Sequence, residues 1–308
     1  MNRIAGIIVA VVGLIIALLG GFKIVPGLTQ TGIFLILLGL LVIGLSFVGK
    51  PESEDTPRMS TLETLTGIFY APAEVFQNLR RHPRWLVAVL VMSVISGVYF
   101  NLFLYRLTPE RVTNYAIDKT LEMPMMSSEE ARRGIEASRA DSLEANKNPV
   151  LRAAQVANGF VGQVFLYAFL AAVFLLFALA MGGKINYWQA FAAAVYASFP
   201  VAVIRYVLNA IILFIKDPTD VHPILGQSSL IQDSLNFLVA PSTSPVLYTL
   251  LSAFSLLAFY WIFMNVTGLK NAGERVSPII AWAATLTIFF IGVALSVLAA
   301  LLFPSFIS

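Results

Sequence analysis

Long uninterrupted runs of apolar residues dominate the chain and predict a bundle of membrane-spanning helices. A helix needs about 20 apolar residues to cross the ~30 Å hydrocarbon core of a bilayer. Seven segments reach or approach that length: 4–22, 32–48, 84–106, 156–181, 188–215, 245–267 and 277–303. The first follows Arg3 as a signal peptide would, but its apolar stretch is too long and residues 18–23 form a poor cleavage site. We expect this segment to be retained as a spanning helix.

Composition supports an all-α polytopic transmembrane helical bundle. Of the 308 residues, 58% are hydrophobic and 12% are charged, whereas soluble domains carry roughly a quarter charged residues. The chain has no cysteine and two histidines, which excludes disulfides, thiolate metal sites and histidine-rich metal sites. The formal charge of +3 is typical of contact with anionic lipid head groups and gives no indication of nucleic-acid binding.

Polar stretches divide the chain into a two-helix and a five-helix part. Residues 1–50 predict a transmembrane helical hairpin, and 51–63 an acidic linker that is too polar to pack. Residues 64–308 predict a five-helix membrane domain. Its extramembrane loop 107–155, with eight acidic and seven basic residues, predicts two solvated helices. Thr108-Pro109-Glu110 is typical of a helix start, and Ser127 with Glu130 of a capping box.

Two further helices are expected at the membrane interface. The first begins at Pro72, carries Arg80 and Arg81 in its last turn and stops before Pro83. Its apolar residues share one face, which is typical of an amphipathic interfacial helix: Val75, Phe76 and Leu79. The second is predicted within residues 216–244 from apolar residues at helical spacing: Leu230, Ile231, Leu235, Leu238 and Val239.

The positions of the basic residues predict the orientation in the membrane. Alternation of the spans puts nine bases on the side of the N-terminus: Arg3, Lys50, Arg58, Arg80, Arg81, Arg84, Lys184, Lys270 and Arg275. The opposite side has ten, but most lie in the single loop 107–155. The positive-inside rule weights short loops and helix ends. We therefore expect a cytoplasmic N-terminus, with loop 107–155 and the C-terminus outside.

A stripe of small residues predicts close packing of the first two helices. The first helix carries Gly6, Gly13 and Gly20 on one face, with Ala10 and Ala17 between them. The second helix carries Gly32 and Gly39 at a spacing of seven. Small residues let helix backbones approach closely within a membrane. The simpler interpretation is an intramolecular hairpin, and the alternative is a homodimer formed through the stripe.

Arg205 is the one charged residue well inside a predicted span. An arginine at the bilayer centre costs at least ~2.5–3.5 kcal/mol, so its presence calls for a reason. Asn209 lies one turn further along, and Gln163 and Tyr167 lie at about matching depth in the preceding helix. These four residues form a candidate intramembrane polar site for an anion or a lipid head group. The alternative is an arginine that snorkels outward or bonds helix carbonyls.

The sequence offers no constellation for catalysis. We find no Ser/His/Asp set, no paired intramembrane carboxylates and no phosphate-binding loop, so we expect no enzyme, no catalytic residues and no cofactor. Asp217, Asp220 and His222 are spaced like metal ligands but lack a second cluster to complete a site. Missing intramembrane carboxylates also argue against a proton-coupled transporter.

From about residue 60 onward the chain resembles the Yip (Ypt-interacting protein) domain family. The likeness rests on residues 69–76 (FYAPAEVF), on the basic run 80–85, on the polar loop after the first span, and on the 181–184 (MGGK) turn followed by Gln189-Ala190-Phe191 and Tyr196-x-x-x-Pro200. The resemblance implies five helices after a cytoplasmic segment, and its eukaryotic members look like adaptors for Rab GTPases. Of their Asp-Leu-Tyr-Gly-Pro element this chain keeps Tyr70 and Pro72. The short N-terminus with its added hairpin is more similar to the bacterial branch.

These observations lead to two hypotheses about function. The first is a non-enzymatic protein of a bacterial inner membrane that organises protein or lipid partners, including anionic head groups or a second copy of itself. Its cytoplasmic contact surface would be Tyr70, Pro72, Phe76, Arg80, Arg81, Arg84 and Trp85. The alternative is a transporter or channel that moves a small anionic or neutral solute past Arg205 and a kink at Pro200.

Overall fold

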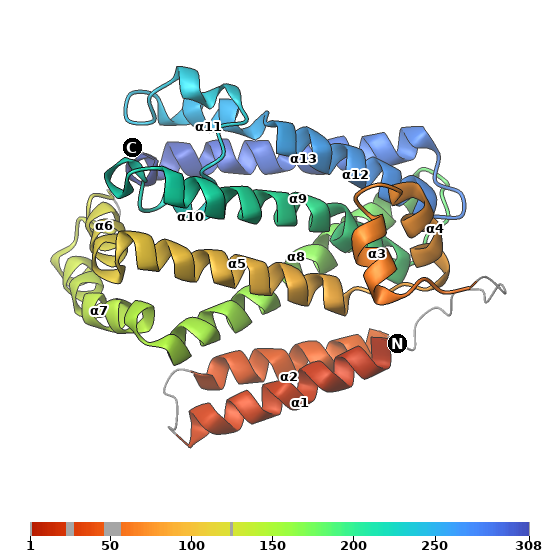
Figure 1. Cartoon of the computed structure of the whole chain (residues 1–308), viewed down its shortest axis with the longest axis horizontal. Helices are drawn as coiled ribbons and strands as arrows, with labels where there is room; N and C mark the ends of the chain where they lie inside the picture. The colour runs from red at the N-terminus through yellow and green to blue at the C-terminus, as the bar shows by residue number, and fades with distance from the viewer. Residues whose placement is uncertain (1, 23–27, 46–56, 124–125, 308) are drawn as a thin grey trace. The chain divides into compact units, whose positions relative to one another are not determined.

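The computed structural model describes residues 2–22, 28–45, 57–123 and 126–307, and these fold almost entirely into helices (Figure 1). The α-helices are α1 (Asn2–Gly21), α2 (Leu28–Leu45), α3 (Thr61–Gly67), α4 (Pro72–Arg81), α5 (Leu86–Leu107), α6 (Pro109–Leu121), α7 (Glu129–Lys147), α8 (Pro149–Ala180), α9 (Tyr187–Ile215), α10 (Leu225–Ser228), α11 (Pro245–Ala253), α12 (Leu256–Ala272) and α13 (Pro278–Leu302). Within the described ranges, five are long and apolar enough to cross a membrane: α1, α5, α8, α9 and α13. The predicted all-α polytopic class is confirmed.

The predicted sixth span is wrong as a single helix. Residues 245–267 form α11 and the start of α12, which are separated at Phe254 and Ser255. α12 has 17 residues and is therefore about 26 Å long at 1.5 Å per residue. Side chains satisfy its first backbone N–H groups: the Ser255 hydroxyl accepts from Ala258 at 3.0 Å, and the Asp233 carboxylate accepts from Leu257 at 2.9 Å. Such caps begin a new helix inside an apolar run.

The interfacial helix predicted around residues 230–239 is also wrong. Here the backbone is irregular, with a 3-10 turn at η3 (Leu235–Leu238) and an antiparallel bridge between Ser234 and Ser255. The Asn209 side chain holds this segment to α9, because its oxygen accepts from the Leu230 N–H at 2.9 Å. Tertiary bonds to α9 and α12 replace the bonds that a local helix would have made.

The loop 107–155 contains the two predicted helices, α6 and α7. Thr108 caps α6, as the sequence indicated, by accepting a bond from the N–H of Arg111. α7 instead begins one residue later than predicted, since its N-cap is Ser128, whose hydroxyl accepts from Ala131 at 3.2 Å. The capping box assigned to Ser127 is therefore wrong.

Helices α1 and α2 run side by side (Figure 1). The glycines of the small-residue stripe lie on their facing sides. A Cβ added at Gly13 would lie 2.6 Å from the backbone nitrogen of Ile36, and one at Gly6 would lie 2.8 Å from the carbonyl oxygen of Gly39. Added Cβ atoms at Gly20, Gly32 and Gly39 would likewise meet backbone atoms of the facing helix. Within the described residues, the stripe thus serves a contact inside one chain.

Contacts divide the chain into two compact units. Unit 1 comprises Met1–Val94, Ala153–Pro200 and Trp261–Thr287, and unit 2 comprises Ile95–Arg152, Val201–Tyr260 and Ile288–Ser308. In unit 1, every residue of α9 from Trp188 to Pro200 is buried. Phe76 of α4 is fully buried too, and its ring lies 3.0 Å from where a Cβ on Gly268 would stand. Small residues thus allow a dense interior.

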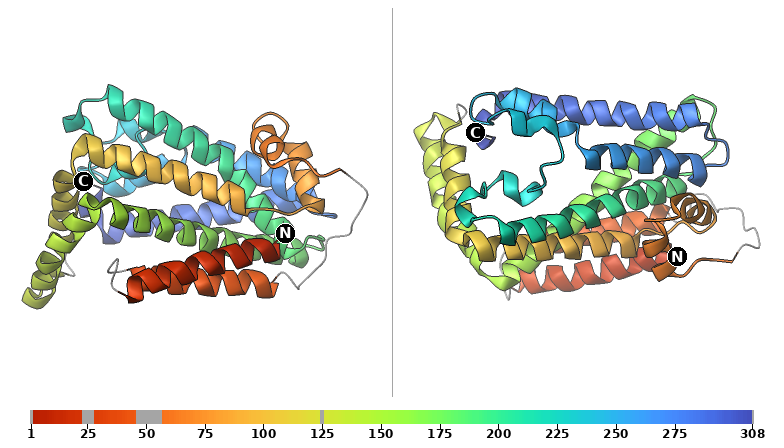
Figure 2. Two further views of the ribbon diagram at one scale, coloured as in Figure 1. Left: turned by 60° about the horizontal axis from the view of Figure 1, so that its bottom comes forward. Right: turned by 45° about the horizontal axis from the view of Figure 1, so that its top comes forward.

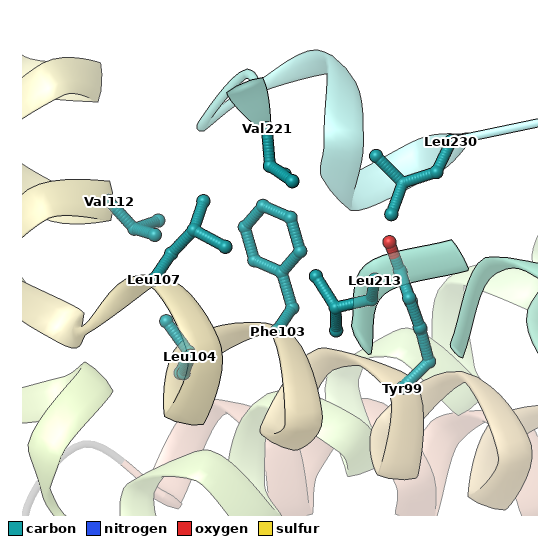
Figure 3. Close-up of a cluster of buried hydrophobic side chains, with 8 residues drawn as sticks. All are labelled: Tyr99, Phe103, Leu104, Leu107, Val112, Leu213, Val221 and Leu230. Atoms are coloured by element: carbon teal, nitrogen blue, oxygen red, sulfur yellow. The ribbon is translucent and has the colours of Figure 1, made fainter. Parts of the chain in front are cut away.

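Unit 2 has a core of its own, which joins α5, α6 and α9 to the segment after α9 (Figure 3). It consists of buried side chains from all four: Tyr99, Phe103, Leu104, Leu107, Val112, Leu213, Val221 and Leu230. The Tyr99 hydroxyl also donates a hydrogen bond to the carbonyl of Gly226. The segment after α9 is therefore packed in place by its own apolar side chains.

Candidate functional site

The predicted contact surface of unit 1 has a buried part and an exposed part. Phe76, Arg84 and Trp85 are buried, with Phe76 at 0% exposure. Tyr70, by contrast, is 77% exposed, and Arg80 and Arg81 are half-buried. Tyr70, Arg80 and Arg81 are therefore accessible to a partner, whereas Phe76, Arg84 and Trp85 are packed inside the fold.

Arg84 connects the start of α3 to the start of α5. Its Nη2 donates to the carbonyl oxygens of Met59 at 2.7 Å and Ser60 at 3.2 Å, and to the hydroxyl of Thr64. Ser60 in turn forms a capping box with Glu63. The hydrogen bond from the Ser60 N–H holds the pKa of the Glu63 carboxyl below its ordinary value. Arg84 therefore acts within the fold, and its charge is not presented outward.

Half-buried and exposed basic side chains line an open hollow of about 450 Å³. Arg80 and Arg81, in the last turn of α4, and Lys270, in the last turn of α12, contribute its three cationic side chains. Gln77 joins the two helices through a 3.3 Å hydrogen bond to Asn271. Cations at a helix C-terminus are stabilised by the helix dipole. Glu74 and Glu274 line the same hollow, so its lining has three bases and two acids.

Exposed apolar side chains accompany this hollow in the same unit. Leu62 and Phe69, in and just after α3, are exposed together with Tyr70. Leu62 is 71% exposed, so burial within the described residues does not explain an apolar side chain at this position. A surface that combines cations with exposed aromatic and aliphatic groups is typical of membrane-interface contact.

The residues of the candidate intramembrane polar site lie in different surroundings. In unit 1, Gln163 accepts a 3.4 Å bond from the Ser93 hydroxyl, and the Tyr167 hydroxyl contacts the Met92 sulfur at 3.6 Å. In unit 2, Asn209 is fully buried and binds the segment after α10. Gln163 and Tyr167 thus have neighbours on α5, and Asn209 fixes a loop.

Arg205 lines a cavity of about 870 Å³ within unit 2. The walls come from α9, from residues 216–241, and from α11, α12 and α13. The ribbon of these elements can be followed in Figure 2. The side chain is half-buried, and its Nε atom is buried without a hydrogen-bond partner among the described residues. The sequence indicated Arg205 as unusual. It gave no signal for the cavity, since that depends on the break between α11 and α12.

The side chains with metal-like spacing stabilise turns. The Asp217 carboxylate accepts from the N–H and the hydroxyl of Thr219, at 2.8 and 2.6 Å. His222 Nδ1 accepts from the N–H groups of Ile224 and Leu225, and its Nε2 shares a 3.1 Å hydrogen bond with the hydroxyl of Tyr115. Among the described residues, no group of three potential metal-ligating side chains comes together.

The comparisons with known proteins agree with the resemblance drawn from residues 69–76 and 181–200. A model of the Yip1 domain matches residues 66–302, from the end of α3 to the last residue of α13. Neither a search of curated proteins nor a search of solved structures gave a match. The match covers more than half of the chain and leaves α1 and α2 outside it. The chain belongs to the Yip1 domain family.

Proposed function

We propose that this Yip1-family membrane protein binds anionic lipid head groups on the cytoplasmic face of an inner membrane and thereby organises lipids or lipid-associated partners. The observation that carries the proposal is the hollow between α4 and α12, where Arg80, Arg81 and Lys270 present three cations. The proposed activity is binding, without chemical turnover.

Charge and apolar contact act together in this proposal. A lysine or arginine near an anionic leaflet contributes about 1 kcal/mol, and the two carboxylates in the lining offset part of the ~3 kcal/mol that three bases would contribute. The exposed side chains of Leu62, Phe69 and Tyr70 add interfacial burial. Because the electrostatic part is screened within a Debye length, binding should weaken as salt rises.

Charge balance supports the proposed orientation. The described part of unit 1 has eight basic residues and three acidic ones. Unit 2 has ten basic and eleven acidic residues. Several of its bases are paired with acids in α6 and α7, as in Arg139 with Asp118 at 2.8 Å. Bases outnumber acids in unit 1 and do not in unit 2, so the face of unit 1 is the better candidate for the cytoplasmic side.

The experiment compares two double variants, each of which loses two arginines that are neighbours in the sequence. The full chain with Arg80→Gln and Arg81→Gln is reconstituted in nanodiscs of mixed phosphatidylglycerol and phosphatidylcholine, and the lipids retained after gentle delipidation are quantified by mass spectrometry. We expect retained phosphatidylglycerol to fall about tenfold or more, since two charges are removed. The control is Arg132→Gln with Arg133→Gln, an exposed pair in α7. Equal retention by both double variants would contradict the proposal.

Orientation is tested independently by thiol labelling. The chain has no cysteine, so Leu62→Cys in α3 and Gly134→Cys in α7 each introduce a single exposed thiol. In intact cells an impermeant reagent should label position 134 and leave position 62 unlabelled, and both should react after permeabilisation. The reverse pattern would place the basic hollow outside the cell.

A further inference from the structure

The Arg205 cavity is a separate feature of unit 2, and its walls are preformed. Asn209 fixes one wall, because its side chain binds the Ser228 carbonyl at 3.3 Å and the Leu230 N–H at 2.9 Å. Asp233 fixes another wall, since its carboxylate and its carbonyl accept from the first N–H groups of α12. Irregular backbone beside spanning helices is tolerated where it is packed against protein or lines a wet cavity. This segment does both.

The cavity lining carries two cations and two acids, and one of the acids is already bound within the fold. Arg205 and Lys216 supply two cations, and Asp220 and Asp233 are the acids in the lining. The Asp233 carboxylate is bound by the N–H of Leu257 and so compensates the positive end of α12. Asp220 is exposed at the start of the segment. Arg205 is half-buried and lines the cavity, so the accessible part of its guanidinium can donate to a bound oxyanion.

The remaining lining suits a phosphate that carries an apolar chain. Serine hydroxyls and one tyrosine hydroxyl come from three walls, namely the segment after α9, α11 and α13: Ser229, Ser252, Tyr248 and Ser296. Phe237 and Leu238 line the same cavity, and each is largely exposed. The guanidinium fork matches phosphate geometry, and a volume of about 870 Å³ is in the range of ligand pockets and exceeds the needs of a lone oxyanion.

We infer that the cavity of unit 2 binds the phosphate group of a small phosphorylated ligand, with Arg205 as the main cationic contact and Phe237 and Leu238 beside its apolar part. The phosphate can belong to a lipid head group or to free phosphate. This site does not depend on the proposed head-group surface of unit 1, because none of the residues that line the two hollows is shared.

The test is a titration of the purified full chain in a neutral detergent. The probes are dihexanoyl phosphatidylglycerol, a soluble short-chain lipid, and inorganic phosphate. Isothermal calorimetry should show saturable binding to the wild-type chain, and Arg205→Met should weaken it about tenfold to 100-fold, since one charge-assisted bond is lost. Arg205→Lys should retain part of the affinity. Competition by inorganic phosphate identifies the free ion as a sufficient ligand, and lack of competition identifies the lipid.

Two matched variants make the outcome decisive. Arg152→Met removes another arginine of unit 2 whose Nε is buried without a partner among the described residues, but which lies outside this lining, so wild-type affinity is expected. Ser296→Trp fills the cavity from α13, leaves Arg205 in place and should abolish binding even if Arg205→Met does not fold. The Arg80→Gln, Arg81→Gln variant should bind the probe normally. Saturable binding that survives Ser296→Trp, or no binding to the wild-type chain, would overturn the inference.

Discussion

The two parts of α9 show how one helix can serve two environments. From Trp188 to Pro200, in unit 1, all residues are buried and alanine is frequent. From Ala202 to Ile215, in unit 2, only Asn209 and Leu213 are buried. Small side chains let neighbouring elements approach closely in the first part. In the second part most side chains are partly buried or exposed, and Arg205 lines a cavity. The densely packed part of α9 thus belongs to unit 1, and the part that lines the cavity belongs to unit 2.

The largest effect should come from the same enlargement made in each part of α9. Ala194→Leu adds three carbons to a fully buried site and should lower the free energy of unfolding by about 1–3 kcal/mol through overpacking. Ala202→Leu enlarges a half-buried position and should change stability by less than about 0.5 kcal/mol. Thermal unfolding of the purified variants in neutral detergent measures both. Equal losses would show that the two parts are equally dense.

Removal of two arginines should have a smaller but still unequal effect. Arg84→Met deletes three hydrogen bonds made by Nη2 in unit 1 and should destabilise the protein by about 1.5–2 kcal/mol. Arg205 makes no hydrogen bond within the described residues, so Arg205→Met should cost less than about 1 kcal/mol or even stabilise the fold. The same unfolding assay applies. A larger loss for Arg205→Met would make that residue structural.

The smallest effect concerns pH and the ion pairs of α6 and α7. Hydrogen bonds from Lys147 and Arg139 lower the pKa values of Glu110 and Glu136 below the ordinary 4.5. A depressed carboxyl pKa contributes stability that is complete above the unfolded value and is lost as pH falls through the folded value. The hydrogen-exchange protection factors of amides in residues 109–123 and 126–147 should therefore fall below about pH 4.5. The ion-pair-free stretch from Trp188 to Pro200 is the control and should keep its protection, and loss of protection in both regions would indicate global unfolding.

The sequence predicted the features that depend on local pattern. Apolar runs gave the long helices, and Pro72 with Arg80 and Arg81 gave the bounds of α4. Thr108 was identified as a cap because its hydroxyl serves an N–H three residues away. The likeness at residues 69–76 and 80–85, in the polar loop and at residues 181–200 indicated the Yip1 family, and the family match confirms it.

Features that depend on distant side chains could not be predicted. The break at Phe254 and Ser255 is held by Asp233, and the irregular path near Leu230 is held by Asn209. By hydropathy, residues 245–267 form one continuous apolar run. The helical spacing at 230–239 does not reveal the bond from Leu230 to Asn209 or the bond from Leu257 to Asp233. Phe76, Arg84 and Trp85 were grouped with exposed neighbours, because adjacency in sequence does not show which side chains the fold buries.

The capped start of α12 has a consequence for biogenesis. Insertion machinery that responds to apolarity admits residues 245–267 as a single segment, yet the first turn of α12 obtains its partners from Asp233, in the polar stretch synthesised before it. Membrane entry and completion of the fold are therefore separate events. A nascent chain that has already inserted this segment must still bring Asp233 back to Leu257 before the cavity exists.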